Sequence, residues 1–167
     1  MRLSARVDYA LRAMAELAAA TGAAPDAAVP AAGDEPVRSA RLVTADRLAA
    51  VQEIPPKFLE SILLQLRRGG IVTAQRGPEG GYRLARPADE ISLADIIRVI
   101  DGPLANVRGH RPEELGYHGA AASLQEIWIA LRASEREILE LVTIDDVATG
   151  KMPDRVRDLS ADPRAWA

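Results

Sequence analysis

The sequence predicts a mainly α-helical fold with one small β-hairpin, and three observations lead to this prediction. Hydrophobic residues make up 48% of the 167 residues and aromatic residues only 4%, so Leu, Ile, Val and Ala must fill the core. Apolar residues recur at the spacing of a helix along most of the chain. A glycine-rich stretch, residues 76–81, separates two short segments with the composition of strands.

The N-terminal segment is expected to form an amphipathic helix over residues 4–20, with Ser4 as its N-cap. Its apolar residues recur at helical spacing, at Val7, Leu11, Met14 and Leu17. Residues 21–43 have no such periodicity and are rich in Ala, Pro and Gly, which is typical of a mobile loop. A docking segment is the alternative interpretation of this stretch.

Two short helices are predicted after the loop. The first covers residues 44–53 and begins at the N-cap Thr44. The second lies within residues 54–70, because proline is tolerated in a first turn and Gly69-Gly70 is a suitable end. Its expected apolar face consists of Phe58, Leu59, Ile62, Leu63 and Leu66. Two short helices joined by a tight turn indicate a helix-turn-helix.

A β-hairpin is predicted directly after these helices, with strands at Ile71–Gln75 and Tyr82–Arg86. A helix-turn-helix followed by a hairpin is the winged form of the motif. Residues 1–88 are therefore interpreted as a winged helix-turn-helix domain, with 21–43 as an inserted loop.

The rest of the chain is predicted to serve another purpose. A helix is expected at 92–101, capped by Ser92, then an irregular segment at 104–122 and a long helix at 123–142. The apolar stripe of the long helix is too wide for one small domain to cover, which indicates a dimerisation helix. Its candidate interface residues are Leu124, Ile127, Leu131, Ile138 and Leu141.

A further turn of helix is expected from Thr143 to Gly150, followed by a frayed tail. The sequence therefore predicts three parts. Residues 1–88 form a winged helix-turn-helix DNA-binding domain, residues 89–150 form a linker helix, a loop and a dimerisation helix, and residues 151–167 form a tail.

The composition excludes several classes of function. The chain has no cysteine, which excludes disulfides, zinc fingers, thiolate catalysis and iron–sulfur clusters held by cysteine. No stretch approaches the roughly 18 apolar residues of a membrane span, and the N-terminus lacks the apolar core of a signal peptide, so the protein is expected in the cytoplasm. The sequence shows no nucleophile–base pair, phosphate-binding loop before a helix or metal triad, so no enzyme is predicted.

Charge is distributed unevenly along the chain. The net charge is −3, yet residues 1–86 hold 12 basic and 9 acidic residues, whereas 87–167 hold 9 basic and 15 acidic residues. Residues 54–86 alone hold six basic and two acidic residues, a pattern that favours contact with DNA phosphates.

The predicted helix-turn-helix points to candidate DNA-binding residues. The second helix of such a motif enters the major groove with its N-terminal residues nearest the bases, here Lys57, Glu60 and Ser61. Arg76 lies at the hairpin tip, from which an arginine can enter a narrow minor groove. The alternative is a solvated hairpin whose glycines only make the turn.

Two further arginines, Arg67 and Arg68, lie at the far end of the second helix. They either contact the DNA backbone or interact with the helix dipole.

Three segments, MRLSARVDYALRAM, IPPKFLESILLQLRRGGIV and RGPEGGYRLARPADEISLADIIRVIDG, resemble the Rrf2 family of bacterial transcription regulators. The resemblance implies a homodimer with a winged domain at each end and a C-terminal helix that crosses to the partner. It implies DNA contacts from the recognition helix and from a wing arginine, which correspond to Lys57, Glu60, Ser61 and Arg76. Arg2 and Ser4 match positions that contact the DNA backbone in relatives.

The sequence departs from this family where several members hold an iron–sulfur cluster. Those members place cysteines in the segment that corresponds to 104–122, which has none here. One relative also uses an acid and a histidine on the first helix, where this chain has Asp8 and Arg12. The longer loop at 21–43 is a second departure. The resemblance therefore implies a regulator, expected to be a repressor, with no cofactor and an effector other than a cluster.

A pocket for an anionic small molecule is the predicted effector site, with candidate residues Arg108, Arg111, Tyr117 and Trp128. Several alternatives stay open. Trp128 can belong to the core or the dimer contact, and the protein can be a constitutive repressor. His110 and His118 are interpreted as polar surface rather than metal ligands. A winged-helix protein-interaction module that has lost DNA binding is the alternative function.

Overall fold

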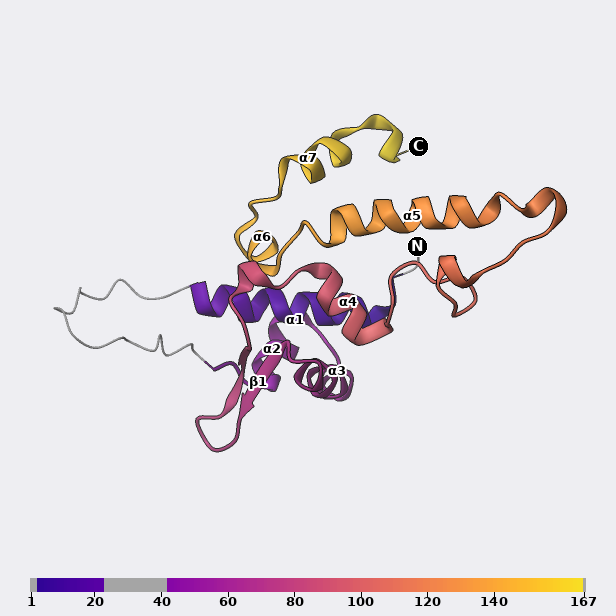
Figure 1. Ribbon diagram of the computed structural model, residues 1–167. Coiled ribbons are helices and arrows are strands. Elements are labelled where there is room, and N and C mark those ends of the chain that lie inside the picture. Colours follow the sequence, from indigo (N-terminus) through magenta and orange to yellow (C-terminus); the bar gives the residue numbers. More distant parts are fainter. Residues whose placement is uncertain (1–2, 23–41, 167) are drawn as a thin grey trace, which may run out of the picture.

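The computed structural model describes residues 3–22 and 42–166, and it confirms the mainly helical fold with one hairpin (Figure 1). Its helices and strands follow the order α1 (Ala5–Gly22), α2 (Ala45–Gln52), α3 (Pro56–Arg68), β1 (Val72–Gln75), β2 (Gly81–Leu84), α4 (Leu93–Asp101), α5 (Leu124–Leu139), α6 (Ile144–Thr149) and α7 (Asp154–Ala161). Most of the predicted loop at 21–43 lies outside the described residues.

Side-chain caps fix the start of three helices where the sequence predicts them. Thr44 accepts a hydrogen bond from the third residue after it and caps α2. Ser92 with Asp95, and Thr143 with Asp146, form capping boxes at the starts of α4 and α6. Each cap satisfies backbone N–H groups that the first turn of a helix leaves without a partner.

One hydrophobic core is shared by elements from both ends of the chain. It contains Met14 of α1, Leu63 of α3 and Ile96 of α4, all 0% exposed. Ile144 of α6 is also 0% exposed, and α6 packs on α1. The segment after residue 88 therefore completes the core of the winged helix-turn-helix rather than building a separate one.

The hairpin of β1 and β2 carries a third, minimal strand that the sequence does not predict. Val43 and Tyr82 exchange backbone hydrogen bonds, with N···O distances of 2.9 and 2.8 Å. A Cβ atom on Gly81 would lie 2.8 Å from the carbonyl oxygen of Val43, so this close approach requires glycine. The pairing holds Val43, just before α2, against strand β2.

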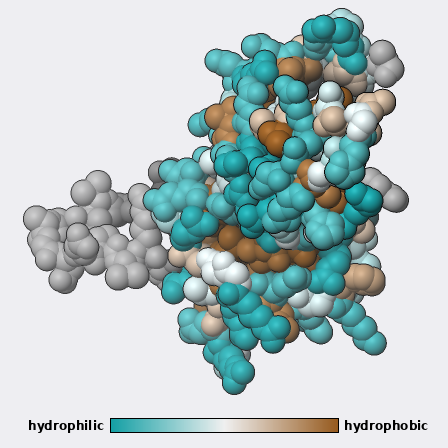
Figure 2. All heavy atoms as spheres, turned by 45° about the vertical axis from the view of Figure 1, so that its right-hand side comes forward, coloured by the Kyte–Doolittle hydropathy of each residue, from teal (hydrophilic) through white to brown (hydrophobic). Residues whose placement is uncertain are grey.

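The long helix α5 lies on the side of the molecule opposite the hairpin (Figure 1). It ends at Leu139 rather than at residue 142, and none of its residues is buried. Three of the predicted interface residues are largely exposed, with Ile127 at 50%, Leu131 at 51% and Leu141 at 44%. Leu124 and Ile138 are half-buried. Figure 2 shows hydrophobic side chains gathered in places on an otherwise hydrophilic face.

The frayed tail expected after residue 150 is wrong for residues 154–161, which form α7. Pro153 precedes the helix, and Asp154 in its first turn pairs with Arg157. An ion pair at 2.9 Å also joins Arg155 to Glu137 of α5. These pairs and the proline at the helix start favour helix in a segment whose low apolar content indicated a tail.

Candidate nucleic-acid interface

Helix α3 and the hairpin lie on the same side of the molecule, away from α5 (Figure 1). Helix α3 begins with a proline in its first turn, where a backbone N–H would have no partner within the helix, so the missing N–H of proline costs nothing. Its buried face consists of Leu59, Ile62, Leu63 and Leu66. Lys57, Glu60 and Ser61 are all exposed at its N-terminal half, where the sequence places them.

The exposed polar groups of α3 differ in what they offer to a base. Ser61 donates its hydroxyl to the carbonyl of Phe58 at 2.8 Å, so its oxygen is left as an acceptor. An ionised Glu60 is also an acceptor, while the ammonium of Lys57 is a donor. The two acceptors, Glu60 and Ser61, suit a base edge that presents an amino group. The donor Lys57 suits a phosphate or the edge of a guanine.

Phe58 does not belong to the buried face of α3, contrary to the sequence prediction. It is 54% exposed, whereas Leu59 beside it is 0% exposed. The helical repeat turns the chain by about 100° per residue, so only one of these neighbours can face the core. An exposed phenyl ring at the start of the recognition helix can pack against the methyl group of thymine.

The hairpin presents Arg76 at the start of a tight turn. Gly77 has a φ of 116°, a conformation that side chains rarely adopt. A Cβ atom on Gly80 would lie 2.4 Å from the carbonyl oxygen of Gln75. Both glycines therefore serve the turn itself, and the exposed Arg76 side chain is held at its edge.

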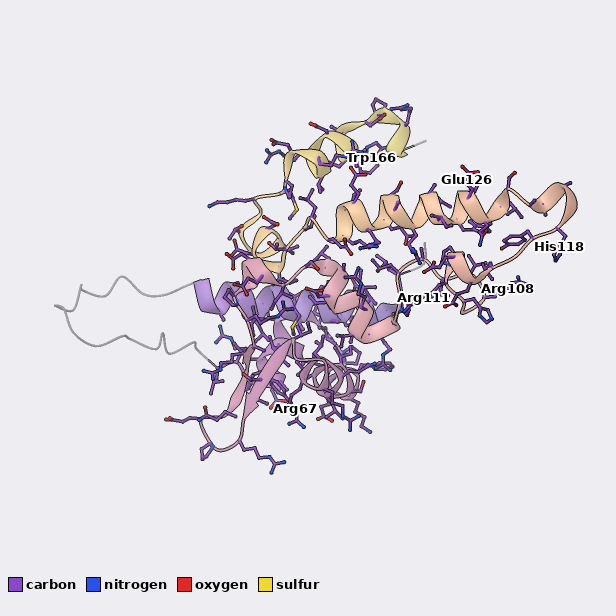
Figure 3. The ribbon with its side chains drawn as sticks, in the orientation of Figure 1. Arg67, Arg108, Arg111, His118, Glu126 and Trp166 are labelled. Atoms are coloured by element: carbon purple, nitrogen blue, oxygen red, sulfur yellow. The ribbon has the colours of Figure 1, made fainter. Side chains whose placement is uncertain are left out.

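The basic residues of this region divide into two groups. Lys57, Arg67, Arg68 and Arg76 form no ion pair with any residue that the structure describes, and all are exposed. Arg67 lies in the last turn of α3, and Figure 3 shows it beside this helix.

The other two basic residues are engaged within the fold. Arg83 donates to Thr73 across the hairpin at 3.2 Å, and Arg86 pairs with Asp95 at 3.4 Å. Arg86 therefore helps to hold the start of α4.

The predicted N-terminal contacts are only partly described. Ser4 accepts a hydrogen bond from the backbone N–H of Val7 at 3.2 Å, which makes it the cap of α1. Its hydroxyl hydrogen is left for another acceptor. Arg2 lies outside the described residues.

Polar contacts fix α3 against its neighbours. Arg6 of α1 donates to the side-chain carbonyl of Gln65 at 2.6 Å. The amide nitrogen of Gln65 donates to the carbonyl oxygens of Val99 and Ile100 in α4, both at 3.3 Å. Helix α3 is thereby joined to α1 on one side and to α4 on the other.

The four candidate effector residues occupy different surroundings. Trp128 donates its indole N–H to the hydroxyl of Tyr117 at 3.1 Å. Arg111 lines a separate cavity between α4, the loop after it and α5. Arg108 is exposed, with a φ of 54°, and Figure 3 shows it on the side of the loop away from α4. The structure brings together Tyr117 and Trp128, but not the two arginines.

The acid and the arginine on α1 form an ion pair, with 3.1 Å between Asp8 and Arg12. Arg12 also lies 5.5 Å from the centre of the Tyr9 ring and donates to the side chain of Gln52 at 3.2 Å. These contacts tie α1 to the end of α2.

Comparison with known protein families places this arrangement among transcription regulators. A profile described as Rrf2, iron-dependent transcriptional regulator, matches residues 36–150. Over 165 residues the chain is 47% identical to Rv1287 of Mycobacterium tuberculosis, whose name describes an HTH-type transcriptional regulator; the match covers 99% of this chain and 92% of that protein. It is 30% identical over 149 residues to the HTH-type transcriptional regulator CymR of Bacillus subtilis, covering 89% and 91%.

Solved structures agree with these matches. The structure of CymR, described as the global cysteine regulator of B. subtilis, has a TM-score of 0.64 and 28% identity, and the match covers 89% of this chain and 97% of that one. The structure of IscR from T. potens also has a TM-score of 0.64, with 26% identity and coverage of 91% and 89%.

The family description names iron, and the donor atoms of this chain do not fit an iron–sulfur cluster. Such clusters are held by thiolates, and the chain contains no cysteine. Arg12 has no lone pair to offer a metal. Among residues 3–22 and 42–166, no three His, Asp or Glu side chains gather around a common point for a metal ion. Within the same ranges, no helix has the length and apolar character needed to cross a membrane.

Proposed function

Because the chain belongs to the Rrf2 family of transcriptional regulators, we propose that it binds specific operator DNA as a homodimer and represses transcription in the cytoplasm. The observation that carries this proposal is that the N-terminal half of α3 and Arg76 at the hairpin turn are both exposed, with basic side chains that have no ion-pair partner among the described residues. Free guanidinium and ammonium groups on one side of a domain are suited to DNA phosphates.

We propose that some of these residues read the base sequence and that others position the protein on the DNA backbone. Glu60 and Ser61 accept hydrogen bonds from base amino groups, and Phe58 packs on a thymine methyl group. Lys57 contacts a guanine edge or a phosphate, and Arg76 enters the minor groove. Arg2, Ser4, Arg67 and Arg68 are assigned to contacts with the DNA backbone, which fix the register of the protein on the duplex.

The homodimer is proposed to form through the apolar face of α5. Leucine and isoleucine side chains that are about half exposed on one helix bury apolar area when a second copy covers them. A two-fold dimer presents its recognition helices to two half-sites, so the operator is pseudo-palindromic.

An electrophoretic mobility-shift assay on the promoter of the gene for this protein tests the proposal. Sequence-specific binding should persist against excess unrelated DNA and weaken steeply as salt rises. A reporter gene under the same promoter should be transcribed more when the regulator is deleted. Absence of binding to this promoter and to a pool of random duplexes would favour the protein-interaction module instead.

Control by a small-molecule effector is the remaining part of the proposal. An effector near residues 104–128 can act only through different affinities for the dimer arrangements that bind and release DNA. The absence of thiolate ligands makes a small molecule or a partner protein the chemistry left to this segment.

A further inference from the structure

A cavity of about 450 Å³ lies between α4, the loop after it and α5. Four arginines from three separate segments line it, Arg98 of α4, Arg111 of the loop, and Arg132 and Arg136 of α5. Figure 3 shows Arg111 on the side of the loop that faces α4. We propose that this cavity binds a small anion with two or more negative charges, a polycarboxylate or a phosphate compound, and that this anion is the effector.

The charge balance of the cavity carries the proposal. Arg132 pairs with Glu113, and Glu140 accepts from both Arg98 and Arg136. Four guanidinium groups therefore face two carboxylates. Asp95 lies 3.8 Å from Arg98 but is shared with Arg86, so it does not remove the excess. A guanidinium stays charged at any pH that proteins tolerate, so about two positive charges are left for a ligand.

Arg111 is the arginine best placed to meet that ligand first. It is exposed, and it forms no ion pair with the described residues. Its position in the loop is fixed by its backbone N–H, which donates to the carboxylate of Glu114 at 3.2 Å. Arg132 is less accessible, with its side chain 23% exposed, and Leu104 beside it is buried at 7%. Planar guanidinium groups bind carboxylate and phosphate oxygens in pairs, which suits a partly enclosed site of this kind.

The two glutamates strengthen the site rather than neutralise it. A backbone hydrogen bond and the Arg132 side chain lower the pKa of Glu113, and hydrogen bonds from Arg136 and Arg98 lower that of Glu140. Both glutamates are therefore ionised at neutral pH and hold three arginines in place around the cavity. An entering anion meets guanidinium groups that are already oriented, which reduces the entropy lost on binding.

The cavity joins the elements that this regulator must coordinate, an argument that rests on the proposed function. Arg98 precedes Val99 and Ile100, whose carbonyls accept hydrogen bonds from Gln65 of the recognition helix. Arg132 and Arg136 belong to the proposed dimerisation helix. An anion that bridges α4 and α5 favours one arrangement of recognition helix and dimer interface, and so changes operator affinity.

Isothermal titration calorimetry and thermal denaturation of the full-length protein test the site without DNA. The probes are citrate and inorganic phosphate, with acetate and sodium chloride at matched ionic strength as controls. Citrate or phosphate should raise the melting temperature saturably in the wild type. The double variant Arg132→Gln/Arg136→Gln should bind the same probe at least about tenfold more weakly, because it lacks both guanidinium groups that α5 contributes to the cavity.

Two further variants make the result specific. Arg155→Gln removes an exposed arginine outside the cavity and should bind as the wild type does. Arg132→Lys/Arg136→Lys keeps the charges and should give intermediate affinity, since lysine lacks the planar pair of donors. The proposal would be overturned if citrate or phosphate raised the melting temperature of the wild type and of the glutamine double variant equally. It would also be overturned if sodium chloride raised the melting temperature of the wild type as much as citrate and phosphate do. Comparing the affinity for citrate with that for phosphate shows whether the site prefers a polycarboxylate or a phosphate compound.

Operator binding then separates this inference from the proposed function. Fluorescence anisotropy without any probe anion first gives the reference operator affinity of the wild type and of the glutamine double variant. Saturating citrate or phosphate should change operator affinity at least about threefold in the wild type only. If neither protein binds any operator, the proposed function fails while the calorimetric result on the cavity stands. If the anion binds and operator affinity is unchanged, the effector role is excluded.

Discussion

Gly69 and Val99 lie so close that a Cβ atom on Gly69 would stand 2.6 Å from Cγ2 of Val99. The contact packs the end of α3 against α4. Gly69→Ala should therefore lower the free energy of unfolding by about 1–3 kcal/mol, the usual cost of overpacking. The stiff β-branched side chain of Val99 cannot easily turn away. Urea denaturation at fixed protein concentration measures the loss.

Two control variants test the cause of that loss. Gly116 has no atom within 4 Å of its Cβ position, so Gly116→Ala should leave stability within about 0.5 kcal/mol. Gly69→Ala/Val99→Ala should lose less than the sum of the two single changes, because the shortened side chain removes the clash. Additive losses would show that the two positions do not press on each other.

Arg76→Ala should weaken binding to a specific operator by about 1–3 kcal/mol. The loss should be greatest where A·T pairs narrow the minor groove beside the hairpin tip, because the negative potential is deepest there. Fluorescence anisotropy on operators that differ only at those pairs measures it. Arg76→Lys is the matched control that keeps the charge. Wild-type affinity in the alanine variant would remove Arg76 from the interface.

Phe58→Ala should abolish the loss of operator affinity that follows when one contacted thymine is replaced with uracil. Replacing a contacted thymine with uracil removes only a methyl group, which should weaken binding of the wild type because Phe58 loses its apolar contact. The variant should bind both operators equally. A scan of uracil substitutions across the half-site, read by mobility shift, locates the position. Equal sensitivity of both proteins at every position would exclude Phe58 as a reader.

Leu131→Asp should convert the proposed dimer into a monomer, because it places a charge in the apolar face of α5 that a second copy is proposed to cover. Sedimentation equilibrium at micromolar concentration measures the change, and operator affinity should fall with it. Ala133→Asp is the control, since Ala133 is also exposed but lies about half a turn away on α5. A monomeric wild type would contradict the proposed assembly.

The carboxylate of Glu140 should make stability depend on pH in acid. Hydrogen bonds from Arg136 and Arg98 lower its folded pKa below the ordinary value of 4.5. Its contribution to the free energy of unfolding is therefore complete above 4.5 and is lost as the pH falls through the lowered pKa.

Glu140→Gln should accordingly be less stable than the wild type at neutral pH, with a difference that shrinks as the pH falls below 4.5. Urea denaturation across this range measures it. Glu126→Gln in α5, the helix that Glu140 follows, is the control, because Glu126 forms no ion pair with a described residue. A difference that does not vary with pH would assign the effect of Glu140 to shape rather than charge.

Local patterns predicted much of the fold because they act over a few residues. Thr44, Ser92 and Thr143 are found as caps, since a cap needs only its own side chain and the next three N–H groups. The glycine-rich turn predicted the hairpin for the same reason. The exposed position of Phe58 was missed, because adjacent apolar residues at a helix edge give no sign of which one faces the core.

Features made by distant residues could not be predicted in this way. The pairing of Val43 with Tyr82 joins one residue just before α2 to a strand, and no local sequence pattern marks it. The cavity collects arginines from α4, the loop and α5, and their meeting depends on how those elements pack. Of the predicted effector residues, only Arg111 lies there, since sequence spacing carries no information about which loop side chains turn inward.

The late position of Ile144 has a consequence for synthesis on the ribosome. Ile144 covers α1, and its backbone N–H donates to the carbonyl of Ile91 at 2.9 Å. A nascent chain that stops before this residue has already made its recognition helix but leaves apolar surface on α1 uncovered. The core around α1 is therefore complete only after the whole of α5 has been synthesised. Because exposed apolar surface and incomplete packing favour degradation, we expect proteases to remove prematurely terminated chains.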